Sequence, residues 1–94
     1  MEKRVYACSC GCNTARLEVE HHGDTFEVSI VGDPGFPDIT VIMDRLALLR
    51  MIEDAALDGE FILDNGDVNP SVWLSDEQLR ELRLFVYGEL EVQP

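Results

Sequence analysis

Apolar and polar residues alternate strictly in two neighbouring stretches, 15–20 and 26–30. A period of two is typical of strands that bury one face and expose the other. Between the two stretches, His22-Gly23 predicts a tight two-residue turn. The pattern therefore predicts a β-hairpin with one apolar face and one charged face.

The predicted turn fixes which residues face each other across this hairpin. The apolar side chains then meet in three pairs: Ala15–Ile30, Leu17–Val28 and Val19–Phe26. On the polar face, the same register sets Glu18 against Glu27, an unfavourable pair of like charges. Residues 4–7 are expected to pair alongside as a first strand. That strand would bring Lys3 or Arg4 close to these carboxylates.

A loop and a helix are predicted next. Residues 32–38 are rich in Gly, Pro and Asp, which is the composition of a loop. Residues 39–43 fit either a short strand or the lead into a helix. Asp44 is a suitable helix N-cap, and Gly59 is a suitable helix stop. The predicted buried stripe of this helix is Leu46, Leu49, Ile52 and Ala56.

A second hairpin and a second helix complete the chain. The apolar runs 61–63 and 72–74 flank residues 64–67, which include an Asn-Gly pair, a strong hairpin signal. Pro70 indicates that the return strand lies at an edge or begins late. The segment Ser75–Gln78 has the spacing of a capping box and opens a helix. The predicted buried stripe of that helix is Leu79, Leu82, Phe85 and Val86.

The predicted order of elements is β-β-β-α-β-β-α, in one domain that spans residues 1–94. We expect an α+β fold in which two helices pack on one face of an antiparallel sheet. The longest apolar run has four residues, far fewer than a membrane span needs. The first residues also lack the apolar stretch of a secretory signal. A cytoplasmic protein is therefore expected.

The chain is strongly acidic, with 19 Asp and Glu against seven Lys and Arg and a net charge of -12. This charge repels nucleic acids and anionic membranes and attracts basic surfaces, although it also serves solubility. Residues 51–79 hold eight of the acids and no Lys or Arg. We expect this segment to bind a protein with a basic surface. The candidate partner-binding residues are Glu53, Asp54, Asp58, Glu60, Asp64 and Asp67.

Three cysteines, Cys8, Cys10 and Cys12, fall within five residues. Their clustering does not fit a disulfide scaffold, so they are either cytosolic thiols or metal ligands. Alternate residues of a straight strand are about 6.5–7 Å apart, whereas thiolates on one zinc ion are about 3.8 Å apart. The chain must therefore turn, which Gly11 permits. The candidate zinc site consists of the three cysteines and a fourth ligand at the same end of the sheet: Asp33, Asp38 or a second subunit.

The two histidines are not expected to join this site. His21 and His22 lie at the far end of the second strand, about 30 Å from the cysteines at about 3.3 Å per residue. A cysteine nucleophile would therefore lack a base within hydrogen-bonding reach. The sequence also contains no glycine-rich phosphate loop and no ligand spacing for a metal-activated water. We accordingly expect a protein that is not an enzyme.

Several short motifs together resemble a family of small, uncharacterised phage and prophage proteins. The motifs are Cys8-Ser9-Cys10-Gly11-Cys12, the alternating pair 17–19 and 26–30, the helix from Arg45-Leu46 to Gly59, and the junction Leu74-Ser75-Asp76-Glu77-Gln78-Leu79. The chain departs from the family pattern at residues 33–38 and 64–67. The resemblance implies a phage or prophage origin, and hence the cytoplasm of a host cell, but it supplies no activity.

Two functional hypotheses follow from these observations. The first is a non-catalytic phage-type accessory protein that binds a basic surface of a host macromolecule through its acidic face. The second is a small zinc-binding module in which the cysteine cluster holds a structural metal.

Overall fold

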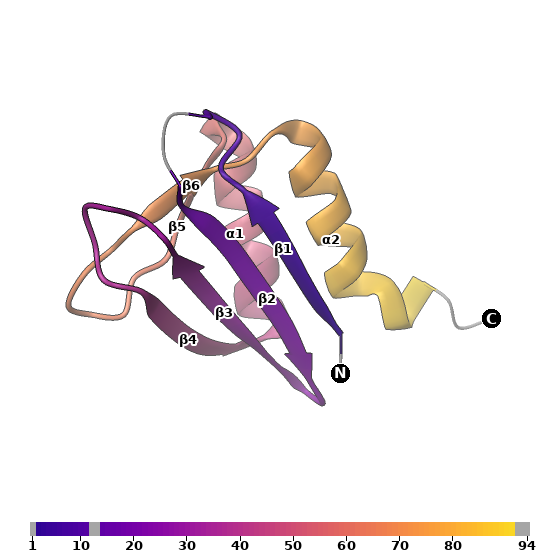
Figure 1. The fold of residues 1–94 in the computed structure, drawn as a ribbon. Coiled ribbons are helices and arrows are strands. Elements are labelled where there is room, and N and C mark those ends of the chain that lie inside the picture. Colours follow the sequence, from indigo (N-terminus) through magenta and orange to yellow (C-terminus); the bar gives the residue numbers. More distant parts are fainter. Residues whose placement is uncertain (1, 12–13, 92–94) are drawn as a thin grey trace.

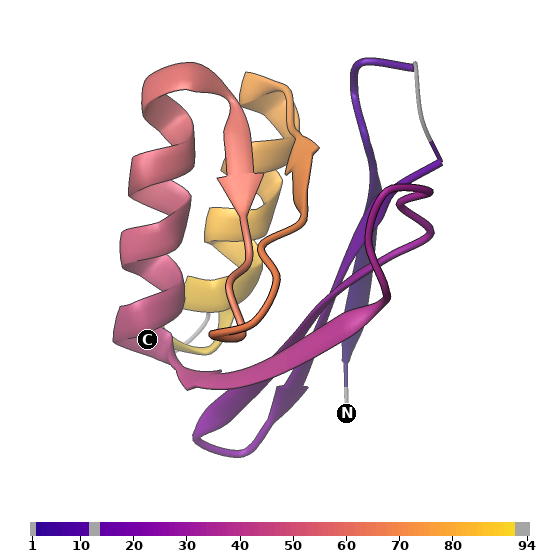
Figure 2. The ribbon, with the colours of Figure 1, turned by 90° about the vertical axis from the view of Figure 1, so that its left-hand side faces the viewer.

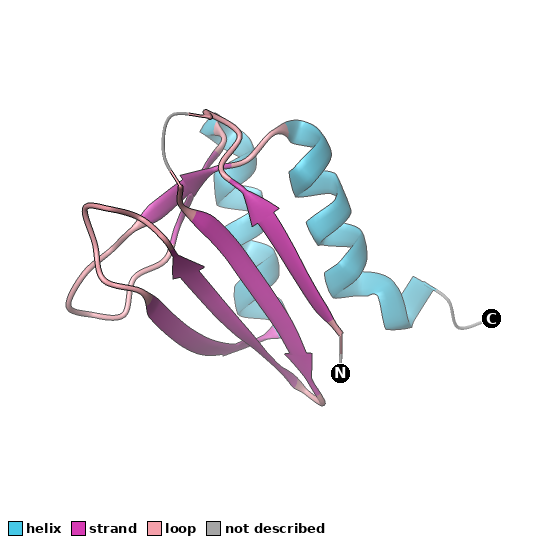
Figure 3. Cartoon of the chain, viewed as in Figure 1, coloured by secondary structure: helices cyan, strands magenta, loops and turns pink. Residues whose placement is uncertain are grey.

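The computed structural model describes residues 2–11 and 14–91. Its elements are β1 (Lys3–Ala7), β2 (Arg16–His22), β3 (Thr25–Val31), β4 (Ile39–Asp44), α1 (Arg45–Asp58), β5 (Glu60–Ile62), β6 (Ser71–Trp73) and α2 (Asp76–Glu91). Strands β1 to β4 form one antiparallel sheet in chain order, and β5 and β6 form a second (Figure 1). Both helices lie on one side of the four-stranded sheet, and the β5–β6 hairpin lies between them and the sheet at one end (Figures 2 and 3). The predicted α+β class is confirmed.

The β2–β3 hairpin exists, but the predicted register is wrong by two residues. Leu17 pairs with Ile30 and Val19 with Val28, so Phe26 faces His21 rather than Val19. The loop is Gly23-Asp24, and Gly23 has a φ of 58°. Tight hairpin turns of this kind need a positive φ at their first loop residue, which glycine adopts without strain.

A shift of two residues leaves every side chain on its original face. Leu17 and Val28 are therefore fully buried, as the alternation predicts. The predicted pair of like charges changes its members, because Glu18 now faces Ser29 and Glu20 faces Glu27. Apolar pairing could not distinguish the two registers, and the turn decides between them.

Strand β1 pairs with β2 as predicted, and its charges reach the carboxylates on the outer face of the sheet. Lys3 Nζ lies 2.9 Å from Glu18 Oε1, and Arg16 Nε donates to Glu18 Oε2 at 3.0 Å. The hydrogen bond from Lys3 is the main reason why the pKa of Glu18 lies below its usual range.

Strand β4 settles the ambiguity of residues 39–43, because it pairs with β3 along its length. Asp44 then caps α1 by accepting a hydrogen bond from the Ala47 N–H at 2.8 Å. Gly59 ends α1 in the left-handed conformation, with a φ of 89°. Both predicted ends of this helix are confirmed.

The predicted buried stripe of α1 is only partly correct, because Ile52 is buried as predicted but Leu46 and Ala56 are exposed. The helix buries Leu48, Ile52 and Ala55, whereas Leu46 is 59% exposed. The first turn is oriented by Arg45, which donates to the Val86 carbonyl of α2 at 3.0 Å. Apolar residues occupy more than one side of this helix, so packing against β3, β4 and α2 selects which side is buried. Of the remaining predicted members, Leu49 is partly buried against the core and Ala56 is exposed.

The backbone pairing of the second hairpin continues beyond β5 and β6 into the connecting loop. Beyond β5 and β6, the Leu63 N–H donates to the Pro70 carbonyl and the Asn65 N–H donates to the Val68 carbonyl. Pro70 immediately precedes β6, in agreement with the prediction of a late start. Ser75 and Gln78 then form the predicted capping box of α2, with reciprocal bonds of 3.1 and 2.9 Å.

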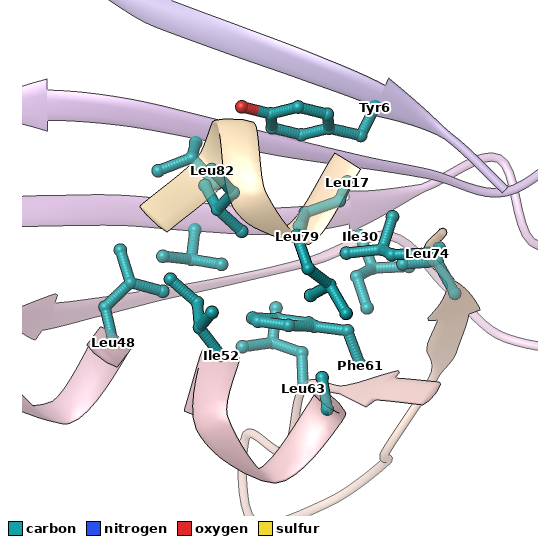
Figure 4. Packing of buried hydrophobic residues seen from close by; sticks show 14 of the residues in the cluster. Tyr6, Leu17, Ile30, Leu48, Ile52, Phe61, Leu63, Leu74, Leu79 and Leu82 are labelled. Atoms are coloured by element: carbon teal, nitrogen blue, oxygen red, sulfur yellow. The ribbon is translucent and has the colours of Figure 1, made fainter. Parts of the chain in front are cut away.

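One hydrophobic core joins the inner faces of both sheets to the two helices. Figure 4 shows Leu17 and Ile30 of the large sheet meeting Ile52 of α1, Phe61 of β5 and Leu82 of α2. The predicted stripe of α2 is confirmed: Leu79, Leu82 and Val86 are buried, and Phe85 packs against them. Within the described residues, no helix is long and apolar enough to cross a membrane.

Candidate functional site

An acidic hollow lies between the C-terminal half of α1 and strand β5. Asp54 and Asp58 are four residues apart, which places them on one face of α1. Gly59 then reverses the chain and brings Glu60 next to them. The hollow has a volume of about 240 Å³ and is lined by these three acids with Met51, Ala55 and Ile62.

Two acids of the hollow, Asp58 and Glu60, are held in place by neutral groups. Asp58 Oδ1 accepts a hydrogen bond from the Glu60 N–H at 3.0 Å. Glu60 Oε2 accepts one from the Ser71 hydroxyl at 2.8 Å. Among the described residues, no basic side chain forms an ion pair with either of them or with Asp54. The negative charge of the hollow therefore faces solvent without a cation.

The structure gathers only part of the predicted partner-binding set. Asp54, Asp58 and Glu60 line the hollow, while Glu53 is exposed on α1 and does not line it. Asp64 and Asp67 lie in the β5–β6 loop, where Asp64 Oδ1 accepts the Gly66 N–H at 2.7 Å. Asp64 thus stabilises its own turn.

Two exposed apolar side chains adjoin the hollow, and neither was predicted from the sequence as part of a site. Ile62 is 47% exposed and lines the hollow. Trp73 is 42% exposed and is the cross-strand partner of Glu60. Residues 61–63 are all apolar, so the sequence carried no alternation there, and only the burial of Phe61 and Leu63 on the opposite face identifies Ile62 as exposed.

The backbone of Trp73 also contacts the cysteine segment. Its N–H points to Cys8 Sγ at 3.2 Å, and its carbonyl accepts the Ser9 N–H at 2.7 Å. Cys8 is buried, and its sulfur lies 3.1 Å from that of exposed Cys10. Gly11, with a φ of 68°, provides the predicted turn after these residues. The first two cysteines are therefore together, beside β6.

The remaining predicted zinc ligands do not complete the site in the described residues. Cys12 lies outside them. The Thr14 hydroxyl donates to the Gly32 carbonyl, so β3 does return to the cysteine end, as predicted. However, Asp33 Oδ1 accepts the Gly35 N–H and Asp38 Oδ1 accepts the Gly32 N–H, so both shape their own loop. Cys8, Cys10 and Asp33 do not form a ligand group.

The histidines lie at the opposite end of the large sheet, as expected. The cysteine segment follows β1, whereas His21 and His22 end β2 at the hairpin turn (Figure 1). His21 stacks on Phe26, with ring centroids 4.5 Å apart. His22 faces the outer side, with Nε2 3.1 Å from Glu20 Oε1. Neither imidazole can serve a thiol at the other end.

Comparisons with protein-family models, with curated proteins and with solved structures found no match for this chain. The likeness to small phage proteins therefore stays a prediction.

Proposed function

We propose that this protein is a non-catalytic accessory protein of phage or prophage type, which binds a basic surface of a host macromolecule through the acidic hollow. The observation that carries the proposal is the combination of Asp54, Asp58 and Glu60 with exposed Ile62 and Trp73. Aromatic and aliphatic anchors beside a charged rim are typical of interface hot spots. A basic side chain could place its aliphatic stem on the apolar residues and its charge among the carboxylates.

The charge distribution also supports a protein partner with a basic surface. A face with uncompensated negative charge accelerates association with a basic surface and disfavours nucleic acid. The effect weakens with salt, because exposed charges are screened beyond about 8 Å at physiological ionic strength. A partner of this kind should therefore bind more weakly as salt rises.

The test is a pull-down from a bacterial lysate with the untagged protein immobilised, followed by measurement of affinity for the captured partner. The variant of choice combines Asp54→Asn, Asp58→Asn and Glu60→Gln, because amides keep the acceptor oxygens that Glu60 N–H and Ser71 require. We expect at least a tenfold loss of affinity. Glu18→Gln, Glu20→Gln and Glu27→Gln on the outer sheet face form the matched control, with an expected loss below about threefold. An affinity that ignores both salt and the hollow variant would contradict the proposal.

A second candidate function is a zinc module at the cysteine segment. It is favoured by the 3.1 Å distance between Cys8 Sγ and Cys10 Sγ and by the Trp73 N–H directed at Cys8 Sγ. Hydrogen bonds of this kind stabilise thiolates that bind metals. A zinc ion there would also fix the position of Trp73 beside the hollow.

Elemental analysis of the untagged protein tests this second candidate. We expect one zinc per chain, lost in Cys10→Ser and retained when His21 and His22 are both replaced. Metal-free protein with all thiols open to a maleimide would refute it.

A further inference from the structure

We propose that the outer face of the β2–β3 hairpin binds a divalent transition-metal ion, with Zn²⁺ as the best match, through Glu20, His22 and Glu27. The three side chains offer one imidazole nitrogen and two carboxylate oxygens, all within 4.8 Å of one another. They form the one such group of His, Cys, Asp or Glu found among the described residues. This site is separate from the acidic hollow and from the cysteine segment.

The hairpin holds the three ligands together. Glu20 and Glu27 are direct partners across β2 and β3, and His22 lies two residues beyond Glu20 on the same face. Beneath them, the fully buried pair Val19–Val28 fixes the register. The ligand set is therefore built on paired strands, which position side chains more accurately than a loop does.

The distances suit a zinc ion. His22 Nε2 lies 3.1 Å from Glu20 Oε1 and 3.9 Å from Glu27 Oε2. Zinc bonds of about 2.0–2.2 Å in a tetrahedral arrangement separate ligand atoms by roughly 3.3–3.5 Å. The two observed distances bracket this range, so small side-chain rotations would bring all three atoms onto one ion.

The charge balance also favours a bound cation. Two carboxylates that face each other across paired strands destabilise the sheet. Lys3 is the cross-strand partner of Glu20, but it directs its ammonium group to Glu18, at 2.9 Å. A divalent ion would neutralise the Glu20–Glu27 pair, and the imidazole of His22 selects Zn²⁺, Ni²⁺ or Cu²⁺ over Mg²⁺ and Ca²⁺.

The site is open to solvent. The side chains of Glu20, His22 and Glu27 are 33%, 35% and 42% exposed. An ion could enter directly and would keep at least one position for water or an external ligand, as three-ligand zinc sites do. Such a site would bind reversibly.

The experiment is a Zn²⁺ titration of the untagged, full-length protein, followed by nuclear magnetic resonance of the amide and imidazole signals. We expect saturable shifts at residues 20–27, including the His22 ring. His22→Gln and Glu27→Gln should each weaken this binding at least tenfold. Matched controls are Glu18→Gln on the same face and His21→Gln on the same strand, both expected to stay within about threefold of wild type.

The cysteine segment is the alternative binding site for zinc, and the same spectra distinguish the two sites. Shifts confined to residues 8–11 and 73, with none at 20–27, would overturn the inference. So would binding at 20–27 that is equally strong in His22→Gln and Glu27→Gln, provided that their melting temperatures show both variants folded. The result is independent of the pull-down, because the hollow variants leave these three ligands intact.

Discussion

The molecule carries two acidic surfaces that differ in how their charge is balanced. On the outer face of the large sheet, Glu18 is held by Lys3 at 2.9 Å and by Arg16 at 3.0 Å. In the hollow between α1 and β5, Asp58 and Glu60 accept hydrogen bonds only from neutral groups among the described residues. The first arrangement neutralises Glu18 within the fold, and the second leaves its acids without a cation.

We expect this difference to separate a stabilising role from a binding role. A cation beside a carboxylate lowers the pKa of that carboxylate, as Lys3 does for Glu18, and a lowered pKa is expected to favour the folded state at neutral pH. Carboxylates held by an amide and a hydroxyl keep their orientation while their charge stays available. A high net charge alone therefore does not indicate a binding surface, whereas the absence of a cation beside particular acids indicates where we expect one.

The largest expected effect tests whether the two faces of β5 differ, one facing the core and the other facing the hollow and the solvent. Phe61→Ala removes a side chain that is 1% exposed and should lower the free energy of unfolding by about 3–5 kcal/mol. Its neighbour Ile62 is 47% exposed, so Ile62→Ala should cost less than about 1 kcal/mol. Urea denaturation measures both values. Equal losses would mean that Ile62 belongs to the core and not to the proposed interface.

The period-two pattern of apolar residues shows how far the sequence could predict this fold. Period-two patterning placed Leu17 and Val28 on the correct face, and capping residues placed both ends of α1 and the start of α2. It could not fix the hairpin register, because a shift of two residues keeps all faces unchanged. That choice depended on the conformation of Gly23.

The candidate site was less predictable, for physical reasons. Charge counting located the segment 51–79, but the hollow forms only when Gly59 folds β5 back along α1. The ligand group of Glu20, His22 and Glu27 needs the shifted register, which places the two glutamates opposite each other. The predicted pairing of Glu18 with Glu27 concealed it. Both features depend on tertiary geometry that local patterns do not encode.

A third acid sharpens the comparison, because the negative charge of Glu81 influences the buried Tyr6 hydroxyl and not a cation. Burial, and then Glu81, raise the pKa of Tyr6 well above its usual value of 10.0. The buried hydroxyl has no hydrogen-bond partner among the described residues. Tyr6→Phe should therefore be neutral or stabilising by about 1 kcal/mol at neutral pH.

The pH dependence of this variant follows from the direction of the shift. The folded protein retains the Tyr6 proton more strongly than the unfolded chain, so wild-type stability should fall as pH rises above about 10. Tyr6→Phe should lose less stability over the same range, as measured by urea denaturation between pH 8 and 11. Parallel curves for the two proteins would show that Tyr6 is not responsible.

Replacing an acid by lysine should change the stability of the fold in opposite directions on the two surfaces. Glu18→Lys places a third positive charge beside Lys3 and Arg16 and should lower the melting temperature. Asp54→Lys adds a cation to a hollow of uncompensated acids and should stabilise the fold by a few tenths of a kcal/mol. Both effects should shrink in high salt. A stabilising Glu18→Lys would remove the distinction between the two surfaces.

The smallest expected effect concerns Glu18 in acid. Its pKa is lowered from 4.5 in the folded state, chiefly by the hydrogen bond from Lys3. A group with a lowered pKa contributes stability above its unfolded value, and that contribution is lost as pH falls through the folded value.

The Glu18 contribution should therefore be present at pH 7 and decline below about pH 4.5. Glu18→Gln should be slightly less stable than wild type at pH 7, and the two should converge in urea denaturation as pH falls through the folded pKa of Glu18. Asp54→Asn removes one charge from the hollow instead and serves as the charge-matched control. A constant difference between Glu18→Gln and wild type across this range would show that the pairing with Lys3 does not stabilise the sheet.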